Sequence, residues 1–177
     1  MFVAQQKEKE NIAEYIIYMY HIEDLIRAFN FDLNVIMEKY VKPQLPDETF
    51  LGQYSAWYAN LIYQMKDERI EKFGHLLQLK EYIVELNYLH NMLMEVLKEE
   101  KYINLFEQTL PVIKEFSAKS NMTDQNHIDI AFHSQYMKLL LKLKKEEISP
   151  ETENAFDQMR VYLAYLSKKY HQMKSEN

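Results

Sequence analysis

Apolar residues recur along most of the chain at alternating steps of three and four, the spacing that places side chains on one face of an α-helix. No segment alternates apolar and polar residues with period two, as a half-buried strand would. The pattern therefore predicts helices joined by short connections. The expected segments cover about residues 8–29, 32–40, 48–74, 75–99, 103–113, 124–143 and 150–173.

Residues that favour helix ends punctuate this pattern. Pro43 and Pro46 predict a loop over residues 41–47, because proline disfavours helix in its vicinity. Gly74 is expected to close the third segment, and Pro111 to kink or break the fifth. The expected N-caps, whose side chains can accept hydrogen bonds from the first free amides, are Asp47, Thr123 or Asp124, and Ser149.

Helices of about 22 residues are roughly 33 Å long, and several of them joined by short loops pack most simply around one core. We expect one all-α domain over residues 1–177, an up-and-down helical bundle of about six or seven helices. The first segment departs from a one-sided pattern, because Ile17 and Tyr20 lie away from its main apolar stripe. Neighbouring helices or a second subunit must cover these two faces.

Composition agrees with a helical protein and excludes several classes of chemistry. The chain has 2 Gly, 4 Pro and 24 aromatic residues (14 Tyr, 9 Phe and 1 Trp), too few turn residues for an all-β fold and too many apolar residues for disorder. It has no Cys, which excludes disulfides, thiolate nucleophiles and cysteine-based metal sites. With two glycines it cannot build a glycine-rich phosphate loop.

Charge and targeting signals point to a protein of the cytoplasm. A net charge of -6 disfavours nucleic acid and anionic lipid as partners. The N-terminal residues lack the basic start and apolar core of a secretory signal. The longest uncharged run, residues 49–65, contains Gln53, Ser55, Asn60 and Gln64, so we expect no membrane span.

The six histidines are candidate metal ligands, because helical bundles often hold metals through Glu-x-x-His pairs. None of the six has Glu three residues earlier, and only Asp124 with His127 comes close. Asp124 is better explained as a cap, and His127 falls on the same side as Lys138, Lys142 and Lys145, which we expect to be a solvated face. Two local pairs, Glu71 with His75 and Asp129 with His133, could bond or share a metal, but two ligands do not close a site. We expect no metal and no cofactor.

His90 is the sharpest single candidate for chemistry. It lies on the apolar seam between Leu86 and Leu93, where a buried imidazole needs a hydrogen-bond partner. We expect that partner to be Asn87, a tyrosine or a carboxylate of a neighbouring helix. The alternative, a catalytic or ligand-binding histidine, stays open.

A second candidate is a face of the first helix. Glu14, Tyr18 and His21 occupy successive turns and could relay protons, beside Asp24 and Arg27, which can pair. No matching nucleophile or oxyanion donor is recognisable, so no residue is assigned as catalytic.

Two stretches of the chain resemble a known family. Residues 11–15 through 22–28 resemble the opening, and residues 85–90 the middle, of a family of uncharacterised bacterial proteins of similar size, best represented in Bacteroidetes. The resemblance implies a free-standing bacterial domain of unknown function and supplies no activity or site residues.

Two functions remain in view. The leading hypothesis is a non-enzymatic bundle that acts through a protein partner or as a homodimer, using the first helix or an aromatic groove. The alternative is a bundle enzyme or sensor that binds a metal or small molecule in its core, near His90 or near the face of Glu14, Tyr18 and His21.

Overall fold

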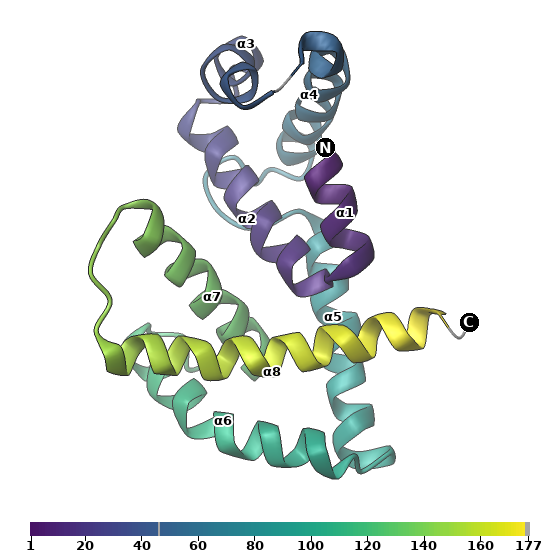
Figure 1. The fold of residues 1–177 in the computed structure, drawn as a ribbon, viewed down its shortest axis with the longest axis vertical. Helices are drawn as coiled ribbons and strands as arrows, with labels where there is room; N and C mark the ends of the chain where they lie inside the picture. The colour runs from purple at the N-terminus through teal and green to yellow at the C-terminus, as the bar shows by residue number, and fades with distance from the viewer. Residues whose placement is uncertain (46, 176–177) are drawn as a thin grey trace.

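The computed structural model describes residues 1–45 and 47–175. Within these residues the chain forms eight α-helices and no strand, so the all-α prediction is confirmed, with slightly more helices than expected (Figure 1). The α-helices are α1 (Phe2–Glu10), α2 (Ile12–Ala28), α3 (Leu33–Ile36), α4 (Leu51–Asp67), α5 (Leu77–Asn91), α6 (Glu100–Lys119), α7 (His127–Leu143) and α8 (Pro150–Ser175).

Short irregular helices extend three of these elements. The π-helical turns η1 (Met37–Val41) and η4 (Met92–Val96) continue α3 and α5, and the 3-10 turns η2 (Lys42–Gln44) and η3 (Glu48–Phe50) lie between η1 and α4. Together α3 and η1 account for the predicted helix over 32–40, and α5 and η4 for that over 75–99. Pro46, the second proline of the predicted loop, lies outside the described residues.

The first predicted helix is in fact two helices, which is the main correction to the sequence pattern. Asn11 has extended backbone (φ -156°, ψ 95°) and separates α1 from α2. Its side chain accepts a hydrogen bond from the backbone N–H of Glu14 at 3.2 Å, so Asn11 is the N-cap of α2. Residues 5–11 are all polar, so apolar periodicity carries no information about a helix end there.

Three further helix ends differ from expectation, and two agree. The cap of α7 is Asn126, which accepts from two backbone amides, rather than Thr123 or Asp124. α4 ends at Asp67, well before Gly74, and α6 runs unbroken through Pro111. Pro111 is exposed, so water can bond the carbonyl that a proline leaves without a donor. Ser149 caps α8 and Asp47 caps η3, which leads directly into α4, as predicted.

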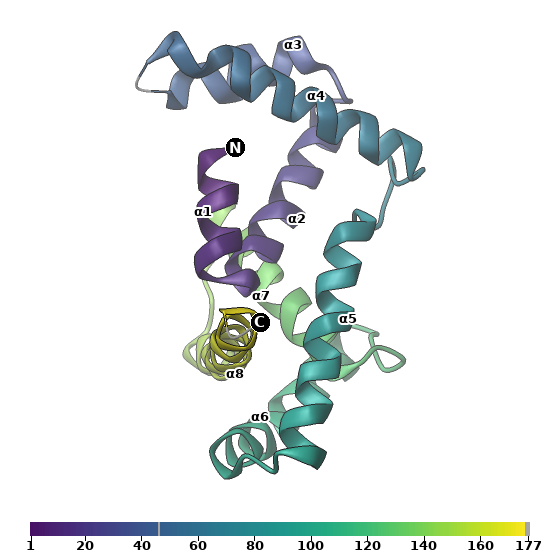
Figure 2. The ribbon, with the colours of Figure 1, turned by 90° about the vertical axis from the view of Figure 1, so that its right-hand side faces the viewer.

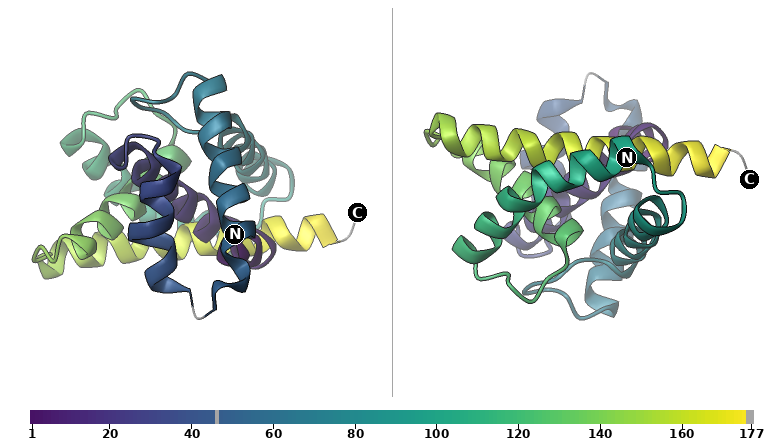
Figure 3. Two further views of the ribbon diagram at one scale, coloured as in Figure 1. Left: turned by 90° about the horizontal axis from the view of Figure 1, so that it is seen from above. Right: turned by 90° about the horizontal axis from the view of Figure 1, so that it is seen from below.

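The long helix α8 organises the bundle. It packs against α2, α5, α6 and α7, and crosses in front of α5 (Figure 1). α1 and α2 lie side by side, while α3 and α4 form one end of the molecule and α6 the other (Figure 2). Seen from above and below, α8 extends across the whole width of the molecule (Figure 3). No helix in the described part of the chain is both long and apolar enough to cross a membrane.

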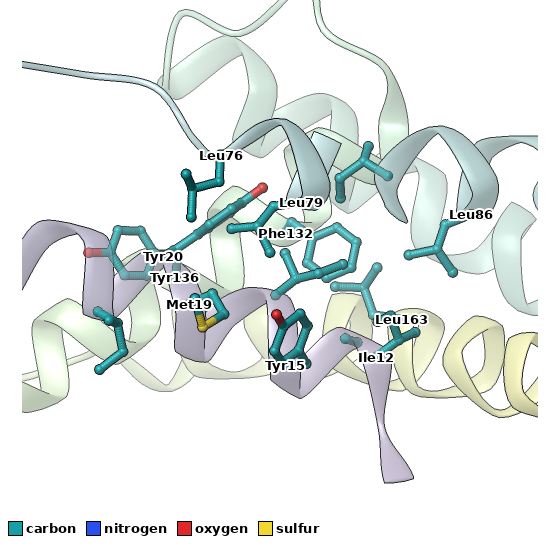
Figure 4. Close-up of a cluster of buried hydrophobic side chains, with 14 of the residues drawn as sticks. Ile12, Tyr15, Met19, Tyr20, Leu76, Leu79, Leu86, Phe132, Tyr136 and Leu163 are labelled. Carbon is teal, nitrogen blue, oxygen red and sulfur yellow. The ribbon is translucent and has the colours of Figure 1, made fainter. Parts of the chain in front are cut away.

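One hydrophobic core contains buried side chains from all of the long helices. Its centre brings Ile12 and Met19 of α2 together with Leu79 of α5, Phe132 of α7 and Leu163 of α8 (Figure 4). Burying one such side chain contributes about 1.5–3 kcal/mol to the stability of the fold. This cluster therefore holds the four helices in their relative positions.

The second apolar face of the first predicted helix is largely covered within one chain. Tyr20 is buried, with its ring stacked on His75 and in edge contact with Tyr136. Ile17 is half-buried and packs against the core. The feature that pointed to this helix as an interface is therefore mostly explained by neighbouring helices.

Candidate functional site

A completely buried carboxylate lies where α2 meets the start of α5. Glu23 of α2 has no exposed surface (0%). Its Oε1 accepts the backbone N–H of Leu76 at 2.8 Å, and its Oε2 lies 2.6 Å from Nδ1 of His75. Glu68 accepts the next amide, that of Leu77, at 2.7 Å. Two carboxylates thus cap the N-terminus of α5, where the helix dipole favours negative charge.

A second ion pair ties the same loop to α2. Arg27 pairs with Asp24 at 2.7 Å and donates to the carbonyl oxygens of Ile70 at 3.0 Å and Gly74 at 2.5 Å. Asp24 also accepts the hydroxyl of Tyr136 from α7. The predicted Asp24–Arg27 pair is confirmed. We call Glu23, His75, Asp24 and Arg27 the α2–α5 clasp, because they join these two helices through the loop between α4 and α5.

His75 stacks on Tyr20 with ring centroids 3.5 Å apart, and its side chain is 34% exposed. Its Nδ1 faces Glu23, and its Nε2 has no hydrogen-bond partner among the described residues. In that part of the chain no hydroxyl or amine side chain is hydrogen-bonded to His75 or Glu23. The arrangement fits a structural role.

The local pairs expected from the sequence do not form. His75 pairs with Glu23, 52 positions away, rather than with Glu71. Asp129 accepts a hydrogen bond from Asn126 and makes none with His133. Burial raises the pKa of Asp129 and lowers the pKa of His133. The nearby His75 acts to lower each of these two pKa values. In residues 1–45 and 47–175 no group of three or more His, Asp or Glu side chains could hold a metal ion.

Sequence reasoning missed Glu23, although a signal was present. Glu23 follows Met19 by four positions and Ile16 by seven, so it lies on the buried face of α2. A carboxylate at such a position must find partners inside the protein. Which partners it finds depends on the loop before α5, and the spacing along α2 carries no information about that loop.

His90 is hydrogen-bonded to tyrosines, one of the three expected partners. Its Nδ1 lies 2.7 Å from the hydroxyl of Tyr102 on α6 and 3.3 Å from that of Tyr162 on α8, and the two hydroxyls are 3.3 Å apart. Asn87, the local alternative, instead donates to its own helix. Burial lowers the pKa of His90, and the nearby His127 lowers it further. This polar cluster links α5, α6 and α8.

The two remaining candidates, the face of Glu14, Tyr18 and His21 and the pair of Asp124 and His127, do not form hydrogen-bonded sites within the residues that the structure describes. Glu14 is exposed and pairs with Lys7 at 2.5 Å, and no hydrogen bond joins it to Tyr18 or His21 among the described residues. Asp124 is exposed and is not the cap of α7. His127 is half-buried, with its ring 5.4 Å from that of Phe106, instead of lying on a solvated face.

A groove of about 450 Å³ lies between α2, α7 and α8. Lys138, expected to be solvated, reaches into this α2/α7/α8 groove with a side chain that is only 10% exposed. Its Nζ lies 2.7 Å from Glu153 and 3.0 Å from Asp157 of α8. Burial alone would lower the pKa of Lys138, but these hydrogen bonds outweigh burial and raise it. The pairing also explains how the ammonium tolerates its buried position.

The fold and these polar clusters define an all-α bundle whose helices are tied together by buried hydrogen bonds. A family model described as Domain of unknown function (DUF4924) matches residues 1–177, and the chain belongs to that family. This confirms the resemblance to a family of unknown function. Comparison with curated proteins and with solved structures found no match.

Proposed function

We propose that the protein acts through association and pairs with a second copy of itself along the outer face of α5. The observation that carries this proposal is a row of exposed apolar side chains on that face: Leu77 (56% exposed), Val84 (67%) and Tyr88 (69%). They are seven and four residues apart, so they lie on one side of the helix. Exposed apolar patches of this kind mark interaction sites in folded proteins.

The opposite side of α5 already has a partner within the chain. It buries Leu79, Ile83, Leu86 and Leu89 against the core. The exposed row is therefore a second apolar face of α5, in addition to the face that packs against the core. Figure 2 shows α5 along one edge of the molecule, with its outer side facing away from the other helices.

The outer face is self-complementary when two copies of α5 pair antiparallel, with the midpoint between Lys80 and Glu81. In this register Leu77 of each chain lies level with Val84 of the other, and Lys80 lies level with Glu81 of the other. Both charged residues are exposed, and neither has an ion pair within the described residues. Phe73, which is 82% exposed just before α5, lengthens the apolar row. Pairing a second copy here joins apolar surface and opposite charges together.

The α2–α5 clasp supports the proposal by holding this helix rigid. Glu23 and Glu68 fix the first turn of α5, and Arg27 fixes the loop before it. An interface that is already ordered loses less conformational entropy on binding. The face of Ile17 and Tyr20 exposes less apolar surface to a partner, because Tyr20 is buried by its own chain.

A charge exchange tests both the partner and the register. We expect Lys80→Glu alone and Glu81→Lys alone each to weaken the dimer about fivefold, since each places like charges together, and the double variant to restore it. The measurement is molar mass by light scattering across a concentration series. If the two single variants dimerise as strongly as the original chain, this pairing is wrong. Association with another protein only, without any dimer, would also overturn it.

A further inference from the structure

The α2/α7/α8 groove has a lining suited to a small amphipathic ligand. Its volume of about 450 Å³ is within the range of ligand sites. Side chains of three helices form it, and the apolar residues of its lining that keep exposed surface are Ile17, Leu139 and Ala164. Hydrocarbon placed against these residues leaves water at a gain of about 25 cal/mol per Å².

Every carboxylate that lines the groove already has a cation. Glu153 and Asp157 share Lys138, and Glu14 pairs with Lys7. A cationic ligand would have to break one of these pairs. Lys138 itself, with two carboxylates at its Nζ, is also satisfied.

The two cations at the rim of the groove, Arg160 and Lys142, make fewer hydrogen bonds than Lys138 does. Arg160 uses its Nε toward Asp157 at 3.1 Å, and its two terminal nitrogens have no partner among the described residues. Lys142 lies 3.9 Å from Glu153, beyond hydrogen-bond distance, and its side chain is 60% exposed. The donors left free at the groove are therefore the two terminal nitrogens of Arg160, and two such nitrogens side by side fit the two oxygens of a carboxylate.

The position of Arg160 decides how such a ligand lies. Lys138 faces Asp157 and Lys142 faces Glu153, which shows that α7 and α8 run antiparallel here. Arg160 and Lys142 are consequently on opposite sides of the ion cluster around Lys138. Ala164, one turn beyond Arg160 and exposed, belongs to its side. One carboxylate thus reaches Arg160 while its hydrocarbon body follows the apolar lining of α2 and α8.

We propose that the α2/α7/α8 groove binds an aliphatic monocarboxylate, with its oxygens on the terminal nitrogens of Arg160 and its chain against Ile17 and Ala164. This site is separate from the outer face of α5 and does not depend on dimerisation. Octanoate, octylammonium and octanol share one hydrocarbon chain and differ in charge. They are suitable probes for titration calorimetry with the full chain.

The account predicts that octanoate binds and that octylammonium binds at least about tenfold more weakly. Arg160→Gln should weaken octanoate about tenfold, which corresponds to one lost charged hydrogen-bonded contact. Ala164→Trp should abolish binding by filling the groove. Ala164 is exposed on α8, so the bulky residue is accommodated without repacking the core.

Two exposed residues outside the groove provide matched controls. Arg69→Gln removes a guanidinium, and Ala56→Trp adds an indole on α4, and both should bind octanoate as the original chain does. No heat of octanoate binding, equal binding of octylammonium, or octanoate binding that survives Ala164→Trp would each overturn the proposal. Circular dichroism of each variant verifies that a loss of binding is not a loss of fold.

Discussion

Removing the carboxylate of Glu23 should cost more stability than removing any exposed carboxylate of the protein. Glu23→Ala deletes the acceptor of the Leu76 amide, which is itself buried. An unsatisfied buried donor costs about 1–3 kcal/mol, and the lost hydrogen bond from His75 to a charged group about 1.5–3 kcal/mol. These terms predict a loss of about 3–5 kcal/mol, the usual range for breaking a buried charged pair.

The assay is urea unfolding followed by far-UV circular dichroism at neutral pH. Glu23→Gln separates the two contributions, because its amide oxygen can still accept from Leu76 while the charge is lost, and its destabilisation should be smaller. Glu107→Ala, an exposed glutamate of α6, is the matched control and should change the free energy of unfolding by less than about 0.5 kcal/mol. A loss below about 1 kcal/mol for Glu23→Ala would refute the role assigned to the clasp.

Two further substitutions test the remaining polar contacts. His90→Leu should lower the free energy of unfolding by about 1 kcal/mol at neutral pH, since Tyr102 keeps a second hydroxyl partner. Burial lowers the pKa of His90, so the unfolded chain takes up its proton first as the pH falls below about 6.5, and stability falls with it. The variant should lose stability less steeply between about pH 7 and 5, and an unchanged slope would contradict this. Asn126→Ala should cost about 1 kcal/mol in urea unfolding, against no change for Asp124→Ala, if Asn126 caps α7.

Much of the helical content follows from the spacing of apolar residues, and helix ends follow less well. Ser149 precedes a proline and an acid, a combination that predicts the start of α8, and Ser149 is its cap in the structure. Asn11 ends a run of seven polar residues, 5–11, where no apolar spacing exists that could locate the break. Thr123, Asp124 and Asn126 are all able to cap a helix, and only the path of the preceding loop selects Asn126.

The polar clusters were harder to predict because they join residues far apart in the sequence. The seam position of His90 correctly indicated a hydrogen-bonded histidine, yet Tyr102 and Tyr162 belong to other helices whose rotation the apolar stripes leave open. The same limit applies to Lys138, which lies on the polar side of its own helix and is buried by α8. A stripe defines which face of a helix is buried, but the partner that covers the other faces depends on packing.

The central claim is that the outer face of α5 joins two copies of the chain, and sedimentation equilibrium measures this directly. The account predicts a reversible monomer–dimer equilibrium in the original chain and a monomer for Val84→Glu, whose charge lies in the middle of the apolar row. Tyr63→Glu, on the exposed surface of α4, should leave the dimer intact. An original chain that stays monomeric up to about 1 mM, or a Val84→Glu variant that dimerises equally well, would contradict the claim.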